Sequence, residues 1–131
     1  MADTIELELV SPEKLLLSEA VEMVVIPGED GDFGVLPGHS PVISNIRPGV
    51  LSVFENGAVT QRIFIASGFA EVTTGRCTIL AEGAEPVEDL DQIAVDQQIQ
   101  ELREDAANAD DEISRARVDG ALAIAEAKRT A

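Results

Sequence analysis

The sequence has almost none of the side chains on which most enzymes depend. It contains one histidine, His39, one cysteine, Cys77, and no tyrosine or tryptophan. A single cysteine cannot form a disulfide or a cysteine-based zinc site within one chain. A histidine-based triad could form only around His39, which lies in the turn sequence PGHSP, where a hydrogen-bonding role is more common than catalysis. The scarcity of catalytic groups argues against an enzyme.

Positive charge is also scarce. The chain has 9 Lys and Arg against 25 Asp and Glu, which gives a formal net charge of -16. The phosphates of nucleic acids and the headgroups of anionic lipids would be repelled by that charge. There is no secretion-type start, and no apolar run reaches the roughly 18 residues that a bilayer-spanning helix needs. We therefore expect no nucleic-acid partner and no direct membrane insertion, so that any membrane association comes through a partner protein.

The acidic segment GEDGDFG, residues 28–34, resembles a calcium loop only at its start. An EF-hand loop beginning at Asp30 would place Gly34 and Pro41 at its fifth and twelfth positions, where oxygen ligands are required. The glycines of this segment neither end in lysine nor open a helix, so they do not form a phosphate-binding P-loop. The sequence predicts no metal site and no cofactor.

Residues 4–84 show the alternation that is typical of strands. Ile5, Leu7 and Leu9 alternate with glutamates, and Cys77 lies in a similar run that predicts a buried position. Asn56-Gly57 lies between two apolar runs and predicts a tight hairpin, because both residue types tolerate positive φ. About eight to ten short strands separated by turn glycines predict a β-sandwich or barrel over residues 1–86.

From residue 87 the pattern becomes helical. Apolar residues recur at helical spacing on one predicted helix and then on a second. The two predicted faces are Val95, Ile99, Leu102, Ala106 and Ala109, followed by Ile113, Ala116, Gly120, Ile124 and Ala127. A short polar turn at residues 108–111 separates them, which predicts an antiparallel hairpin over residues 87–131. Small residues on the second face would let the two helices approach closely.

The segment GDFGVLPGHSPVISNIRPG, residues 31–49, concentrates four glycines and three prolines. That composition dictates a turned backbone path. The segment is too apolar for a flexible linker, and we expect its large apolar residues to pack on the sandwich. These residues are Phe33, Val35, Leu36, Val42, Ile43 and Ile46.

Taken together, GDFGVLPGHSP, the following RPG, SGFAEV and the joint AEPVEDLD resemble the epsilon subunit of F-type ATP synthases, called delta in mitochondria. The resemblance covers essentially the whole chain. It implies a mainly β protein, with an N-terminal ten-stranded β-sandwich followed by a C-terminal antiparallel two-helix hairpin. It also implies a non-catalytic central-stalk rotor subunit that binds the gamma subunit and the c-ring and couples proton flow to ATP synthesis. A bacterial protein on the cytoplasmic face of the inner membrane is expected. The alternative is a non-catalytic β-sandwich module that binds other proteins.

The resemblance further implies site residues. Gly31, Asp32, His39 and Ser40 are expected at the rotor interface, with Asp32 facing the polar loops of the c-ring and His39 approaching gamma. Family members that bind ATP carry an arginine in the motif [IL]-D-x-x-R-A, where this sequence has Ala94, so we expect no nucleotide binding.

The hairpin is expected to be a possible regulatory element. In many bacteria it extends along gamma and inhibits ATP hydrolysis, which implies contact with the alpha and beta subunits. The basic residues available for that contact are Arg115, Arg117, Lys128 and Arg129.

Overall fold

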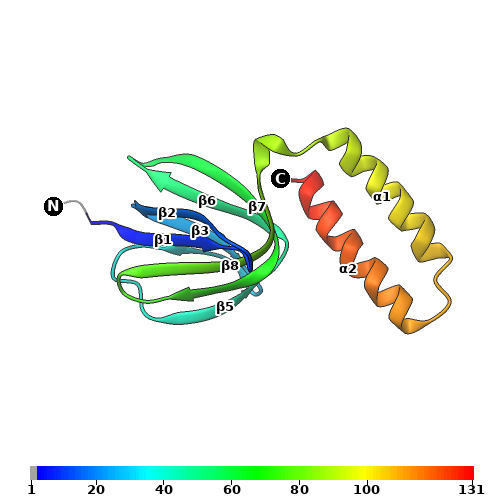
Figure 1. The fold of residues 1–131 in the computed structure, drawn as a ribbon, viewed down its shortest axis with the longest axis horizontal. Coiled ribbons are helices and arrows are strands. Elements are labelled where there is room, and N and C mark those ends of the chain that lie inside the picture. Colours follow the sequence, from blue (N-terminus) through cyan, green and yellow to red (C-terminus); the bar gives the residue numbers. More distant parts are fainter. Residues whose placement is uncertain (1–2) are drawn as a thin grey trace. The chain divides into compact units, whose positions relative to one another are not determined.

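The computed structural model describes residues 3–131, which divide into a β unit ending at Val87 and a helical unit spanning Glu88–Ala131 (Figure 1). Each unit has its own apolar core. The strands are β1 (Ile5–Val10), β2 (Leu15–Val21), β3 (Met23–Gly28), β4 (Gly31–Val35), β5 (Val42–Ile46), β6 (Gly49–Glu55), β7 (Ala58–Val72) and β8 (Arg76–Pro86). A short 3-10 turn (Val87–Asp89) precedes α1 (Gln92–Ala107) and α2 (Glu112–Arg129).

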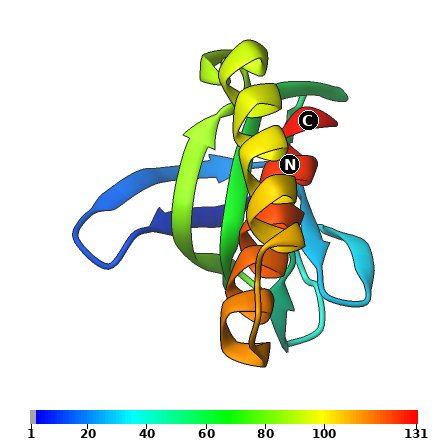
Figure 2. The ribbon, with the colours of Figure 1, turned by 90° about the vertical axis from the view of Figure 1, so that its right-hand side faces the viewer.

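The strands of the β unit form one sheet that folds over into two layers. One layer has the order β2-β1-β8-β7-β5, and the other is built from β4, β3, β6, the first part of β7 and the last part of β8. Strands β1 and β2 form a hairpin at the edge of the first layer (blue, Figure 2). Among the described strand pairs only β1 and β8 run parallel. The sandwich predicted from the alternation is therefore confirmed.

Two long strands bend and so serve both layers. The first part of β7 pairs with β6 and its last part pairs with β5, and the strand turns at Gly68. Gly68 has φ +145°, and a Cβ there would lie 2.0 Å from the carbonyl oxygen of Leu80, so only glycine fits. Strand β8 turns opposite, at Gly83, where φ is +68°. If each half of these two strands is counted separately, the described strands number ten, as the family resemblance implied.

The core of the β unit is aliphatic and dry. Ile5, Leu7 and Leu9 point inward as predicted, with exposed fractions of 0%, 0% and 2%, and Cys77 is fully buried beside them. The predicted hairpin is also confirmed, because Asn56 and Gly57 have φ values of +55° and +76°. The carboxylate of Glu22 accepts hydrogen bonds from both of their backbone N–H groups, at 2.7 and 3.3 Å.

The helical unit is an antiparallel hairpin (yellow to red, Figure 1). Asp91 caps α1 by accepting from the N–H groups of Ile93 and Ala94, and Asp111 caps α2 by accepting from that of Ser114 at 2.6 Å. The hydrogen bond from Ser114 holds the pKa of Asp111 below its usual value. Its cap is thus present at neutral pH and lost as the pH falls through the lowered pKa.

The predicted contact face of α1 is confirmed, but that of α2 is wrong. Val95 and Ile99 are buried as expected. On α2 the buried residues are Val118 and Ala125, whereas Ile113 is 85% exposed. The smallest residue of the predicted face, Gly120, also lies over open space, since a Cβ there would meet nothing within 4 Å. Alanines occur on every side of α2, so their spacing does not select a face.

Candidate interaction surfaces

The turn between β3 and β4, residues 28–32, is tied to the corner that follows β5. The Nη2 atom of Arg47 donates to Oδ1 of Asp32 at 2.6 Å, and Nη1 donates to the carbonyl oxygen of Gly28, also at 2.6 Å. The backbone N–H of Arg47 donates to the carbonyl oxygen of Pro27 at 3.0 Å. The Arg47 side chain therefore reaches both legs of this hairpin, which we call the acidic turn.

A second set of contacts joins the acidic turn to β5 itself. The N–H of Glu29 donates to the carbonyl oxygen of Asn45 at 2.9 Å, and the side-chain amide of Asn45 donates to Oε2 of Glu29 at 3.2 Å. Gly28 is buried, and a Cβ there would lie 2.8 Å from the carbonyl oxygen of Gly31. Close backbone packing and cross-links on both sides give the acidic turn a defined shape.

The three acids of the turn differ in how they are paired. Glu29, Asp30 and Asp32 are all exposed. Asp32 forms an ion pair with Arg47, in which the side chains are 59% and 42% exposed, and Glu29 accepts a hydrogen bond from Asn45. Within residues 3–131, Asp30 makes no ion pair and its side chain makes no hydrogen bond. Of the three acids, only Asp32 is therefore neutralised by a cation, and Asp30 is the one whose side chain has no partner among the described residues.

The predicted interface residues His39 and Ser40 lie in the loop between β4 and β5. His39 is half-buried, and its Nδ1 lies 2.6 Å from the carbonyl oxygen of Ser40. Because a carbonyl oxygen only accepts, this contact requires the proton on Nδ1. The N–H of Gly38 donates to the carbonyl oxygen of Thr74 at 2.8 Å and fastens the loop to the turn between β7 and β8. This arrangement supports a turn role for His39.

No arrangement in residues 3–131 resembles a catalytic or metal site. Burial raises the pKa of the Cys77 thiol to about 12, so it is a neutral core group and no nucleophile. No cluster of His, Cys, Asp and Glu in the described part of the chain could hold a metal ion. Neither helix there is long and apolar enough to cross a membrane.

The apolar residues of the 31–49 segment do not all pack inward as predicted. Val35 and Ile46 are buried and Phe33 packs against the core, in agreement with the prediction. Leu36, Val42 and Ile43, however, are 55%, 36% and 73% exposed. For these three the prediction was wrong, because composition alone does not distinguish a side chain that fills the core from one that lies on the surface.

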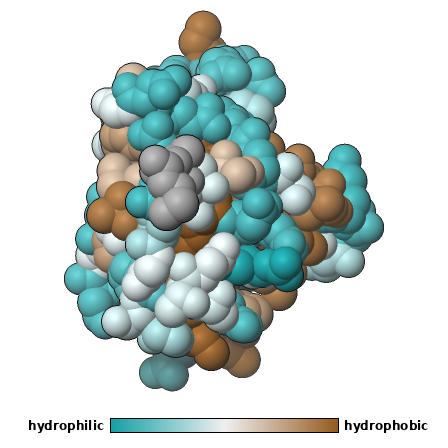
Figure 3. Space-filling view, turned by 90° about the vertical axis from the view of Figure 1, so that its left-hand side faces the viewer, coloured by the Kyte–Doolittle hydropathy of each residue, from teal (hydrophilic) through white to brown (hydrophobic). Residues whose placement is uncertain are grey.

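An apolar row lies on the outer face of the first layer, and Ile43 on β5, which pairs with Glu71, lies diagonally from its Phe69 member. Strand register places Leu15, Val10, Leu80 and Phe69 next to one another across β2, β1, β8 and β7. Leu15 and Phe69 are 57% and 40% exposed. We call these four residues and Ile43 the outer apolar row. On the face shown in Figure 3, apolar side chains lie in separate patches among hydrophilic ones.

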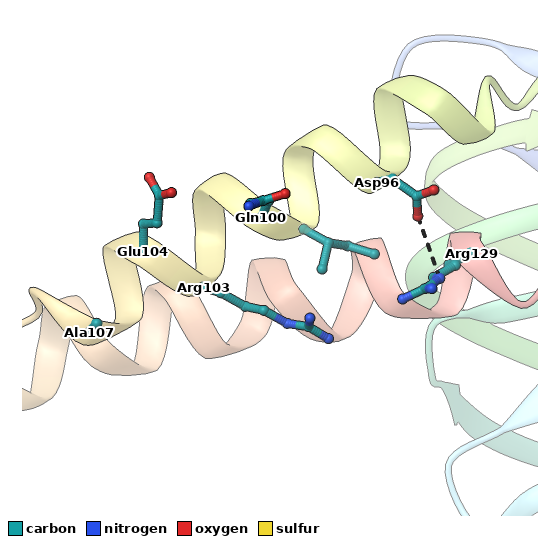
Figure 4. Close-up of a pocket in the computed structure, with 7 residues that line it drawn as sticks. Asp96, Gln100, Arg103, Glu104, Ala107 and Arg129 are labelled. Atoms are coloured by element: carbon teal, nitrogen blue, oxygen red, sulfur yellow. Dashed lines mark ion pairs between the residues drawn. The ribbon is translucent and has the colours of Figure 1, made fainter.

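Two ion pairs join the helices of the hairpin. Nε of Arg129 lies 3.4 Å from Oδ1 of Asp96, and Nη2 of Arg103 lies 3.7 Å from Oε1 of Glu126. In Figure 4 the Arg103 side chain extends from α1 toward α2, whereas Glu104 points away. Asp96, Arg103, Glu104 and Arg129 line a shallow, open hollow together with Ile99. The sequence did not single out Arg103, because its partner lies on the other helix.

The four basic residues predicted to be regulatory, Arg115, Arg117, Lys128 and Arg129, differ in their surroundings. Arg115 and Arg117 are exposed near the start of α2. Arg129 is held by Asp96, and the carbonyl oxygen of Lys128 accepts from the side chain of Gln92 at 3.2 Å. The structure does not bring the four together into one basic surface. Ala94 lies in the first turn of α1, and its N–H is bonded to the capping Asp91.

Comparison with known proteins points to one family. The model for "ATP synthase, Delta/Epsilon chain, beta-sandwich domain" matches residues 4–87. The ATP synthase epsilon chain of Rhodospirillum rubrum is 52% identical over 127 residues, covering 97% of this chain and 95% of the relative. The epsilon chain of Rhodospirillum centenum is 50% identical, with coverages of 98% and 91%.

Solved structures agree with these relatives. A chain in the Euglena gracilis mitochondrial ATP synthase structure of OSCP, F1 and c-ring is 31% identical, with a TM-score of 0.86 and coverages of 99% of this chain and 81% of that one. A chain in the Tetrahymena thermophila mitochondrial ATP synthase central stalk and c-ring structure has a TM-score of 0.68 and coverages of 96% and 94%. At 11% identity, the second match supports the fold alone.

Proposed function

Because this chain belongs to the delta/epsilon chain family of ATP synthase, we propose that it links the gamma subunit to the c-ring in the central stalk. The chain is a non-catalytic rotor subunit of that enzyme. A rotor joint transmits torque, so it needs a rigid body with two separate contact surfaces. The observation that carries the proposal is that the β unit presents two such surfaces, the acidic turn and the outer apolar row.

The acidic turn is the proposed contact with the c-ring. Its backbone path is fixed by hydrogen bonds to β5 and the corner beyond it, and its acids point to solvent. Charge placed on a rigid loop contributes orientation and partner choice more than affinity. We expect the facing loops of the c-ring to offer polar or basic groups. Gly31 gives the turn its shape, with φ +132°.

The outer apolar row, together with His39 and Ser40, is the proposed contact with gamma. Large apolar side chains at 40–73% exposure, such as those of Phe69 and Ile43, gain free energy when a partner covers them. Ile43 follows Ser40 by three residues, so β5 connects that loop to the row. Placement of both surfaces in the enzyme would put this chain on the cytoplasmic side of the bacterial inner membrane.

The hairpin is proposed to regulate ATP hydrolysis by opening and contacting the alpha and beta subunits. Its two helices share a small core of Val95, Ile99 and Ala125, with Leu102 and Leu122 packed against it, so separating them exposes little apolar surface. Deletion of the residues after Glu88 should raise the ATP hydrolysis rate of the assembled enzyme. An unchanged rate would remove the inhibitory role and leave the rotor role intact.

Binding measurements test the two surfaces separately. Ile43→Asp should weaken binding to gamma, whereas Val59→Asp is the matched control, because Val59 is also exposed, at 45%, but lies beside the β6–β7 turn. Asp30→Lys should weaken association with the c-ring, and Glu13→Lys makes the same charge change in the β1–β2 turn. If the wild-type chain bound neither gamma nor the c-ring, a general β-sandwich binding module would be the better description.

A further inference from the structure

The side chain of Arg47 reaches both legs of the acidic turn. Its two terminal nitrogens donate to Gly28 at the end of β3 and to Asp32 at the start of β4, each at 2.6 Å. These two acceptors flank the turn, since Gly28 pairs with Gly31 and Pro27 pairs with Asp32 in the β3–β4 register. The planar guanidinium has donors pointing in two fixed directions, which a lysine lacks.

The same arrangement changes what Asp32 can do. A carboxylate 2.6 Å from a guanidinium presents a dipole to a distant partner more than a net charge. Asp30, two residues earlier, is exposed and unpaired within the described residues. A basic partner approaching the turn would thus meet the unneutralised charges of Asp30 and Glu29, whereas the carboxylate of Asp32 would already be engaged by Arg47.

We propose that Arg47 is the positioning residue of the c-ring contact. Asp32 holds the Arg47 side chain in place through their ion pair and does not itself contact the partner. This inference rests on the proposed function, which assigns the acidic turn to the c-ring. The family resemblance implied that Asp32 faces the c-ring directly. In this proposal Asp32 matters because it helps to hold the turn in shape.

Removal of the Arg47 charge distinguishes a direct role of Asp32 from a positioning role of Arg47, because the two roles predict opposite changes in affinity for the c-ring. If Asp32 meets a basic partner directly, Arg47→Met frees its full charge and binding strengthens or stays the same. If Arg47 positions the turn, Arg47→Met weakens binding by about tenfold, although the turn has become more negative. Arg47→Lys keeps the charge but replaces the two fixed terminal nitrogens with a single one, so we expect binding between that of wild type and Arg47→Met.

The measurement is the affinity of the full-length chain for membranes that carry ATP synthase depleted of this subunit, at low and high salt. Arg47→Met should bind more weakly at both salt concentrations while keeping the salt dependence of wild type. Asp30→Asn should reduce the salt dependence, because it removes an unpaired charge. Glu13→Gln is the control for loss of one acid elsewhere. Thermal unfolding of each variant shows whether the β unit is intact.

The possible results test the positioning role of Arg47 and the assignment of the acidic turn to the c-ring separately. Binding by Arg47→Met that equals or exceeds that of wild type would overturn the positioning role while leaving the docking turn in place. Weaker binding by Arg47→Met together with partial rescue by Arg47→Lys, at unchanged thermal stability, would support it. If Asp30→Asn and Arg47→Met both bound like Glu13→Gln, the assignment of the acidic turn to the c-ring would itself be wrong. A loss of binding that tracked a loss of thermal stability would reduce Arg47 to a general structural role and overturn the inference.

Discussion

The β unit and the helical unit reach order by different physical means. In the β unit seventeen buried apolar residues form one cluster, and glycines shape the bends where backbones touch. The hairpin buries Val95, Ile99 and Ala125 as its cluster and adds two exposed ion pairs, which contribute only a few tenths of a kcal/mol each. We therefore expect the β unit to stay rigid when torque acts on it, and the two helices of the hairpin to separate at a small cost in free energy.

Substitution at the bend of β7 should have the largest effect. Gly68→Ala places a Cβ 2.0 Å from the carbonyl oxygen of Leu80 and requires a non-glycine residue at φ +145°. We expect a loss of more than about 4 kcal/mol in the free energy of unfolding, or no folded protein. Urea unfolding of the purified chain measures it. Gly75→Ala is the matched control, because nothing lies within 4 Å of its added Cβ. Equal stability of the two variants would contradict the proposed cause of the bend.

In the hairpin the largest effect should come from Ile99, which is 3% exposed. Ile99→Ala should cost about 2–3 kcal/mol of the free energy that holds the two helices together, because it leaves a void in a small cluster. Hydrogen exchange of the α1 and α2 amides measures this change. Ile93→Ala removes the same atoms from a side chain that is 75% exposed and should change exchange little. Similar acceleration by both variants would show that the cluster does not hold the hairpin.

Alkaline pH should weaken the β unit through Cys77. Burial raises the pKa of its thiol from 9.0 to about 12, whereas in the unfolded chain it ionises near 9.0. The unfolded state therefore binds fewer protons above pH 9, and stability falls by about 1.4 kcal/mol per pH unit from there toward pH 12. Urea unfolding at pH 8 and pH 10.5 measures the slope. Cys77→Ala should remove this part of the decline, and an identical slope in the variant would show that other groups cause it.

Local patterns in the sequence predicted much of this fold because they report local geometry. Alternation identified the inward side of β1, and Asn56-Gly57 identified a hairpin, since its positive φ values depend on the two residues alone. The bend at Gly68 was not predicted, because its cause is the carbonyl group of Leu80 on a neighbouring strand. A glycine inside a strand-like pattern does not reveal which backbone approaches it.

The interaction surfaces show the same limit. The family resemblance placed Asp32 and His39 in the segment of interest, but the partner of Asp32 is Arg47, fifteen residues later, and their contact depends on how β3, β4 and β5 are joined. The outer apolar row consists of residues from four strands and Ile43 on a fifth, and only their register brings them together. Contacts that depend on sheet register cannot be predicted from the spacing of residue types along the sequence.

The smallest predicted effect is a gain in stability. It comes from a glycine-to-alanine substitution in the hairpin, the same change that should disrupt the β unit at Gly68. Gly120 lies in the interior of α2 over open space, so an added Cβ clashes with nothing. Gly120→Ala should stabilise the hairpin by about 0.5–1 kcal/mol, because alanine loses less backbone entropy than glycine on forming a helix. Slower exchange of the α2 amides would show it. If the hairpin must open to inhibit ATP hydrolysis, the variant should also raise the hydrolysis rate of the assembled enzyme. Faster exchange would mean that Gly120 faces a close neighbour, as the sequence pattern first indicated.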